Sequence, residues 1–237
     1  MKLAIFDFDG TLSRGYIWMA FLDYLNANGL YPDTFYDKQM LLAEENRQGR
    51  LGYDEWCDKC GDLWAKAFAG VPHSKVSNSA SRFFRSFRKN IYASSYKLVD
   101  AIKGAGFTPV IVSAAPYEAI RLGARDPGVG KVYATELETK HGICTGKAAN
   151  PLYRHGKKLK AIKTLSRKYG LAGSAGFGDS IGDKDLLENV EFPIALNPSP
   201  ELRKLAKRRR WLIASKSNVA SVVLNEIKQK HYQTITI

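Results

Sequence analysis

The chain has 237 residues, of which 45% are hydrophobic and 25% charged, and this composition predicts a globular protein with one large domain or a core plus a smaller module. Its 36 basic residues outnumber its 23 acidic ones and give a formal charge of +13, which favours anionic partners. We expect neither a membrane span nor a signal peptide, because the apolar stretches are short and an acid interrupts the first of them. Three cysteines, an odd number, are typical of a reducing compartment, so we expect a cytoplasmic protein.

The first predicted element is a buried parallel strand over residues 3–8, followed by a long helical region. The expected helices of this region cover residues 15–28, 36–48, 53–69 and 74–90. Glycine and proline separate them, and each mixes aromatic and polar residues as helices packed on one face do. Because this stretch has no strong strand signal, it predicts a helical insert.

From residue 96 onward, strand and helix signals alternate. The expected strands cover residues 107–113, 132–135, 174–179, 192–196 and 211–214, the expected helices cover 96–104, 117–124, 157–169, 183–188 and 200–207, and a turn or hairpin lies around 139–145. This alternation predicts an α/β fold with a doubly wound parallel sheet. We assign the core to residues 1–13 and 93–237, and the helical insert to 14–92, which we expect over the C-terminal edge of the sheet.

Two acids, Asp7 and Asp9, end the first predicted strand and are followed by Gly10 and Thr11. Side chains two apart on a strand share a side, so the two carboxylates would repel each other unless a cation or a shared proton offsets the charge. Ligands of open α/β sheets bind at this end of the strands. The pair therefore indicates Mg²⁺ and chemistry on an anion; the alternative is a solvated turn.

Three further motifs fall at predicted strand ends or helix starts. Ser113 ends the second strand, Lys158 begins a helix after Gly156, and Asp179 and Asp183 lie in a Gly-Asp-Ser-Ile-Gly-Asp run. A doubly wound sheet brings such positions to one edge. Together they supply carboxylates, a hydroxyl and an ammonium, which can bind Mg²⁺, neutralise a phosphoryl group and provide a nucleophile.

The order of these motifs resembles the haloacid dehalogenase (HAD) superfamily of phosphohydrolases. The residues that carry the resemblance are Asp7-Phe-Asp9-Gly-Thr11, Ser113, Lys158 and Gly178-Asp179-Ser180-Ile-Gly-Asp183. The helical insert between the first two motifs is similar to the cap of subclass IB, the phosphoserine-phosphatase-like branch. The resemblance implies a Rossmann-like core with a C1-type cap, and a Mg²⁺-dependent phosphomonoesterase that acts on a small phosphorylated metabolite.

The resemblance also implies a role for each acid. Asp7 would be the nucleophile that forms an aspartyl-phosphate, and Asp9 would be general acid for the leaving alcohol and then general base for water. Mg²⁺ would be held by the Asp7 carboxylate, the Asp9 backbone carbonyl and the Asp179 carboxylate. Asp183 would position the water ligands of the metal.

By the same resemblance, Ser113 and Lys158 would bind the phosphoryl oxygens and Thr11 would help to orient the group. Other interpretations of these residues remain open: Ser113 can simply end its strand, Asp183 can cap the helix that begins there, and Lys157 adjoins Lys158. We prefer Lys158 because the helical spacing then turns apolar positions toward the core.

The insert departs from phosphoserine phosphatases in ways that bear on the substrate. Tyr16 stands where those enzymes typically have a glutamate, and the arginine expected in their cap helix has no clear counterpart here. The region is also rich in aromatic residues such as Trp18, Trp56 and Trp64. These rings form the core of the insert or, if they face the site, suit an apolar or quaternary ammonium group. Cys57 and Cys60 lack the sequence context of a redox or zinc motif.

Three functional alternatives follow: a phosphotransferase that uses the same intermediate, phosphoserine phosphatase itself, and a non-catalytic anion-binding protein. Intact Asp7 and Asp9 argue against the last. The basic cluster at residues 204–210 is interpreted as a solvated face, so we expect no nucleic-acid partner.

Overall fold

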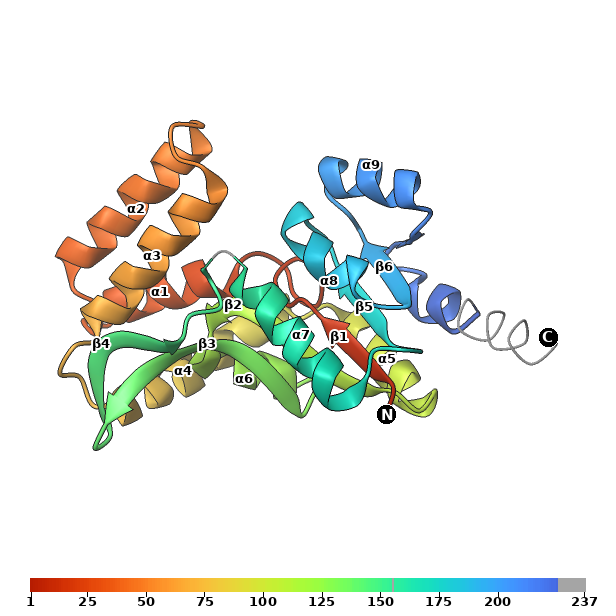
Figure 1. The fold of residues 1–237 in the computed structure, drawn as a ribbon. Coiled ribbons are helices and arrows are strands. Elements are labelled where there is room, and N and C mark those ends of the chain that lie inside the picture. The colour runs from red at the N-terminus through yellow and green to blue at the C-terminus, as the bar shows by residue number, and fades with distance from the viewer. Residues whose placement is uncertain (155, 226–237) are drawn as a thin grey trace.

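The computed structural model describes residues 1–154 and 156–225, and its centre is a seven-stranded sheet (Figure 1). The strands are β1 (Leu3–Phe6), β2 (Thr108–Pro116), β3 (Lys131–Lys140), β4 (Ile143–Asn150), β5 (Ala175–Gly178), β6 (Phe192–Leu196) and β7 (Leu212–Ala214). Their order is β4-β3-β2-β1-β5-β6-β7, and neighbours run parallel except for the β3–β4 pair. This arrangement confirms the predicted doubly wound sheet, with β1 at its centre.

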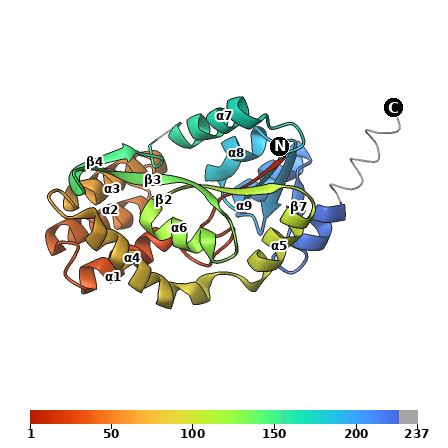
Figure 2. The same ribbon diagram turned by 90° about the horizontal axis from the view of Figure 1, so that it is seen from below.

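Helices cover both faces of the sheet (Figure 2). Outside the insert they are α5 (Ala93–Gly104), α6 (Tyr117–Arg125), α7 (Lys157–Tyr169), α8 (Lys184–Glu188) and α9 (Pro200–Arg209), with a 3₁₀ turn η2 (Ile181–Asp183). β1 explains the layering: Leu3 and Ile5 pack with residues of α7 and α8, while Ala4 and Phe6 pack with residues of α5 and α6. A central strand buried on both faces therefore reads as a continuous apolar run.

Between β1 and β2, the named elements are all helices, as expected for the insert, and loops and turns connect them. It comprises α1 (Ile17–Ala27), α2 (Asp33–Arg47), α3 (Tyr53–Ala67), α4 (His73–Phe87) and the 3₁₀ turn η1 (Arg88–Asn90), followed by α5. α2 and α3 form a hairpin that projects from the sheet edge near β4, and α4 packs on α6 (Figure 1). The division of the chain into two domains stays a prediction.

The β3–β4 hairpin confirms the turn or hairpin expected around residues 139–145, but its strands are longer than expected. A short strand was expected at 132–135, but β3 runs from Lys131 to Lys140 and turns back at His141 and Gly142, which have positive φ. Its outer half pairs with β4 rather than with β2, and β4 in turn supports α3. The outer half of β3 carries exposed polar residues, so it lacks the hydrophobic pattern from which a strand is predicted.

Within residues 1–154 and 156–225, every helix is too short or too polar to span a bilayer.

Candidate active site

Six of the seven predicted site residues surround one cavity of about 430 Å³ at the C-terminal edge of the sheet. Asp7 follows β1 directly, and its backbone N–H donates to the carbonyl of Phe177 in β5 at 2.9 Å, which holds the two strand ends side by side. The predicted residues that line the cavity are Asp7, Asp9, Ser113, Lys158, Asp179 and Asp183. They come from the loop after β1, from β2, from α7 and from the segment that runs from the end of β5 through η2. Motifs far apart in sequence therefore converge on one point.

Lys158 lies in the first turn of α7 and bridges two carboxylates. Its Nζ donates to Asp7 Oδ1 at 2.8 Å and to Asp183 Oδ1 at 2.7 Å. Burial opposes the charged form of the lysine, but the charges of Asp183 and Asp7 outweigh it and raise the pKa of Lys158 above its ordinary value. The ammonium therefore stays charged and fixes the position of the Asp7 carboxylate.

Asp183 uses its two carboxylate oxygens for different purposes. Oδ1 accepts from Lys158, while Oδ2 accepts from the backbone N–H groups of Asp179 and Ser180, each at 3.1 Å. The second set forms a capping box at η2, in which Ser180 is the N-cap and Asp183 the third residue of the turn. As the N-cap of α8, which is the role weighed from the sequence, the Asp183 side chain makes no capping hydrogen bond. Gly178 is required here, since a Cβ would lie 2.4 Å from the Asp183 Cβ.

Thr11 differs from the other predicted residues because it is buried and does not line the cavity. Its Oγ1 donates to Asp179 Oδ1 at 3.0 Å, so the hydroxyl positions that carboxylate. Gly10 lies between them at φ +79°, and a Cβ there would lie 2.1 Å from Asp179 Oδ2. Contact of Thr11 with a phosphoryl group stays a prediction, and its hydroxyl already has a partner.

Asp9 joins the sheet edge to the helical insert. Its Oδ1 accepts from the backbone N–H of Ile17, the first residue of α1, at 2.8 Å. Burial raises the pKa of Asp9 to about 7, although the Ile17 N–H works in the opposite direction. The carboxyl therefore populates both protonation states near neutral pH.

Ser113 is 3% exposed in β2, and its Oγ accepts from the backbone N–H of Ala115 at 3.2 Å. This bond leaves the hydroxyl hydrogen for a further acceptor at the cavity. The structure therefore gives Ser113 a local turn contact while keeping it in the cavity wall.

Three carboxylates form a group suited to a divalent cation. Oxygen atoms of Asp7, Asp179 and Asp183 lie within 4.8 Å of one another, and Lys158 supplies one positive charge against three negative ones. Burial first, and Asp183 second, raise the pKa of Asp7 well above its ordinary value and that of Asp179 to about 6. Oxygen-only donors with excess negative charge fit a hard cation such as Mg²⁺.

A contact that the sequence did not reveal links α3 to the loop before Lys158. The Tyr153 hydroxyl donates to Asp62 Oδ1 at 2.9 Å, and the Arg154 guanidinium binds both oxygens of Asp62 at 2.7 and 2.9 Å. Tyr153 packs against α3 where Gly61 lacks a side chain. The only sequence signal is the position of Tyr153 and Arg154 shortly before Lys158, which does not identify a partner.

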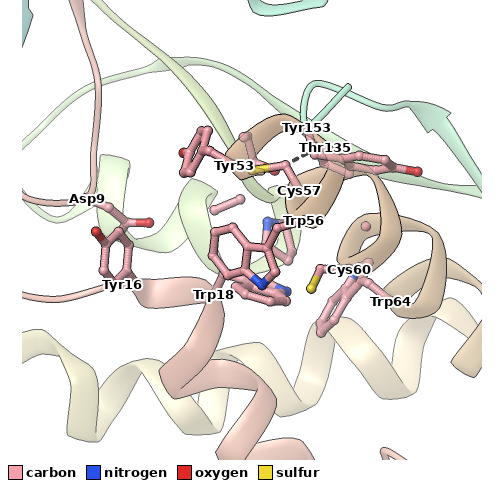
Figure 3. Close-up of a pocket in the computed structure, with 14 residues that line it drawn as sticks. Asp9, Tyr16, Trp18, Tyr53, Trp56, Cys57, Cys60, Trp64, Thr135 and Tyr153 are labelled. Carbon is pink, nitrogen blue, oxygen red and sulfur yellow. Dashed lines mark hydrogen bonds between the residues drawn. The ribbon is translucent and has the colours of Figure 1, made fainter. Parts of the chain in front are cut away.

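A second, smaller pocket of about 110 Å³ adjoins the cavity and shares Asp9, Tyr16, Tyr53, Cys57 and Tyr153 with it (Figure 3). The aromatic side chains of its wall are Tyr16, Trp18, Tyr53, Trp56, Trp64 and Tyr153. Burial raises the pKa of Cys57 to about 11 and that of Cys60 to about 12, so both thiols in this wall stay protonated at neutral pH.

Comparison with known proteins places the chain in a family. The model of the haloacid dehalogenase-like hydrolases matches residues 4–188, and the chain belongs to this family. A Mycobacterium leprae protein named as a hydrolase is 31% identical over 89% of this chain and 71% of its own length. A histidinol-phosphatase of Neisseria meningitidis is 28% identical over 89% of this chain and 96% of its own.

A solved structure of a phosphoserine phosphatase, with an analogue of its phospho-aspartyl intermediate, matches 91% of this chain and 93% of that one with a TM-score of 0.62 and 18% identity. This match confirms the fold. With the family and its phosphatase relatives, the chain is a phosphatase, which is the enzyme class that the motifs indicated.

The carboxylate cluster predicts a pH-dependent response to Mg²⁺. Asp179 has a folded pKa of about 6, above the unfolded value of about 3.9, so its favourable contribution is complete below the unfolded value and is lost as pH rises through about 6. The folded pKa of Asp7 is also raised, so its contribution is likewise lost as pH rises above the unfolded value. Mg²⁺ offsets the charge, so the rise in Tm that it causes should grow across this window. Thermal unfolding with and without Mg²⁺ at several pH values measures this; an equal rise at every pH, or the same response in Asp179→Asn, contradicts it.

The fit of Tyr153 against Gly61 predicts an unusual response to Gly61→Ala. Replacing a glycine inside a helix by alanine ordinarily stabilises by roughly 0.5–1 kcal/mol, but here the new methyl would lie 2.4 Å from the Tyr153 ring. We expect lower stability and a lower kcat/KM instead. In a Tyr153→Ala background the same substitution should stabilise. Chemical unfolding of the four variants measures this, and a gain of stability in both backgrounds would refute the contact.

Proposed function

We propose that this phosphatase is a Mg²⁺-dependent phosphomonoester hydrolase that acts through an aspartyl-phosphate on a small phosphorylated metabolite. The observation that carries the proposal is one cavity that holds a lysine-bound carboxylate, Asp7, and a second carboxyl, Asp9, with a pKa of about 7. The first group suits a nucleophile, and the second suits a proton donor and acceptor at neutral pH.

In the first step the Asp7 carboxylate attacks phosphorus, and an oxygen–phosphorus bond forms as the bond from phosphorus to the alcohol oxygen breaks. Asp9 gives its proton to that oxygen, which leaves as the alcohol. In the second step Asp9 takes a proton from a water that attacks the same phosphorus, and phosphate leaves while Asp7 is regenerated. A pKa near the working pH serves both transfers.

Lys158 and Ser113 would bind the phosphoryl oxygens, the lysine by charge and the serine through its free hydroxyl hydrogen. We propose that Mg²⁺ is held by the carboxylates of Asp7 and Asp179 and the backbone carbonyl of Asp9, while Asp183 positions its water ligands. When bound, the ion neutralises negative charge on the carboxylates and the phosphoryl group.

Residues 14–92 would act as a cap over this chemistry. Support comes from two contacts: the Asp9 bond to Ile17 at the start of α1, and the bonds of Tyr153 and Arg154 to Asp62 in α3. Both tie the insert to segments that carry site residues. Movement of the insert would therefore admit substrate and then exclude water.

The roles of the two acids are tested by replacing each with asparagine. Asp7→Asn keeps the shape but removes the attacking charge, so release of phosphate from an aryl ester should fall to near background with folding intact. Asp9→Asn should impair an alkyl ester more than an activated aryl ester, whose leaving group needs less protonation. Activity of Asp7→Asn within about tenfold of the unaltered protein, or equal losses of Asp9→Asn on both esters, contradicts the assignments.

Phosphoserine is not expected to be the preferred substrate. Tyr16, at the cavity rim and 69% exposed, cannot pair with an ammonium as a carboxylate would. Hydrogen bonds to charged groups contribute roughly 1.5–3 kcal/mol each, so their loss should lower kcat/KM for phosphoserine below that for phosphate esters of uncharged alcohols. Free-phosphate detection across a panel of esters, with and without acceptor alcohols, measures this and separates hydrolysis from phosphotransfer.

A further inference from the structure

We infer that the small pocket lined by aromatic rings receives the alcohol part of the substrate, and that this part carries a flat, uncharged ring with a hydrogen-bond acceptor. The inference rests on the proposed hydrolase function and names the substrate class of the same site. It is carried by the position of the pocket, by its charge, and by two indole N–H groups without partners.

The pocket lies where the leaving group of a bound ester would be. It adjoins the larger cavity along residues that line both, among them Asp9 and Tyr16 (Figure 3). Asp7 and Lys158 line only the larger cavity. A phosphoryl group at Asp7 therefore places the ester oxygen toward Asp9 and the rest of the alcohol in the aromatic pocket.

The walls of this pocket suit a flat ring. The ring centroids of Trp18 and Trp56 are 5.8 Å apart at an interplanar angle of 75°, and Tyr53 lies 5.8 Å from Trp56 at 48°. Rings at such angles offer both faces and edges to a partner, and aromatic pairs favour offset or edge-to-face contact. They belong to α1 and α3, so the helical insert supplies most of this wall.

The charge of the lining argues against an anionic alcohol. Among the described residues that line the pocket there is no lysine, arginine or histidine, and Asp9 is the acid at its mouth. A carboxylate buried there would have no counter-charge, which is strongly unfavourable. An amino acid ester such as phosphoserine therefore fits this pocket poorly.

Two indole N–H groups without partners indicate which kind of uncharged or cationic alcohol part the pocket would favour. The Nε1 groups of Trp56 and Trp64 are buried and have no hydrogen-bond partner among the described residues. An unpaired buried donor is costly, and the cost disappears when an acceptor reaches it. A hydrocarbon or a quaternary ammonium offers no acceptor, whereas a ring nitrogen or ring carbonyl does.

Trp56 is the better candidate for this contact. Trp64 is 1% exposed and stacks on Tyr31, with centroids 5.9 Å apart, so it is held within the core of the insert. Trp56 is partly exposed, and its indole can turn toward a ligand that enters the pocket. We therefore expect Trp56 to determine the preference for an acceptor and Trp64 to contribute less.

An isosteric pair of esters tests the inference. 3-Pyridylmethyl phosphate and benzyl phosphate differ only by one ring nitrogen in place of a CH group, and the pyridine is uncharged near neutral pH. We expect kcat/KM to be about tenfold higher for the pyridyl ester, the factor that one hydrogen bond supplies. Trp56→Phe keeps an aromatic ring but removes the N–H, so it should bring the ratio of the two kcat/KM values close to one.

Trp211→Phe is the matched control, because Trp211 precedes β7 and does not line the pocket. It should leave the ratio unchanged. A ratio of one in the unaltered protein, a ratio that survives both Trp56→Phe and Trp64→Phe, or a tenfold preference for phosphocholine or phosphoserine over both rings would each overturn the inference.

A binding measurement separates failure of this inference from failure of the proposed function. Quenching of tryptophan fluorescence by 3-pyridylmethanol and benzyl alcohol reports on the pocket without any hydrolysis. If activated aryl phosphates are hydrolysed but neither ester nor alcohol shows the nitrogen preference, the pocket assignment is wrong and the hydrolase stands. If no ester is hydrolysed but the alcohols show the preference and Trp56→Phe removes it, the pocket assignment stands and the proposed function is wrong.

Discussion

The arrangement of carboxylates at this edge of the sheet depends on the pairing of the Lys158 ammonium with Asp7 and Asp183. The strand ends of the doubly wound sheet bring carboxylate oxygens of Asp7, Asp179 and Asp183 within 4.8 Å of one another, where their negative charges repel. Lys158 lies between Asp7 and Asp183 at hydrogen-bonding distance from both. A single charge from the start of α7 thereby joins β1 to the turn after β5. Removing the lysine would leave the facing carboxylates without a counter-charge, which is strongly destabilising, whereas Asp7→Asn leaves Lys158 paired with Asp183.

Backbone N–H groups and one side-chain hydroxyl stabilise the remaining excess of negative charge. One oxygen of Asp183 accepts two N–H groups at η2, and Thr11 donates to Asp179. Both contacts need glycine beside them, because a Cβ at Gly10 or Gly178 would collide with these acids. The glycines of the two motifs are therefore a packing requirement of the carboxylates as well as a feature of the turns.

Much of this site could be predicted because its determinants are local. An apolar run that ends in Asp7, or a glycine that precedes Lys158, marks a strand end or a helix start within a few residues. The pairing of Tyr153 and Arg154 with Asp62 could not be predicted, since about ninety positions separate the partners and neither side has a periodic pattern. The aromatic pocket could not be predicted either. The sequence shows which residues are aromatic, but the pocket between them depends on how α1 and α3 pack.

The pKa of Asp9 depends on both the core and the helical insert. Its burial favours the neutral acid, and the N–H of Ile17 favours the carboxylate; their balance sets a pKa of about 7. Ile17 begins α1, the first helix of the insert, so the group that would transfer the proton takes part of its environment from the core and part from α1. A movement of α1 that lengthens this bond removes the N–H that stabilises the carboxylate, so burial then raises the pKa of Asp9 further. A movement that also admits water reduces the burial and lowers the pKa again. The acidity of Asp9 thus depends on the contact between α1 and the sheet edge.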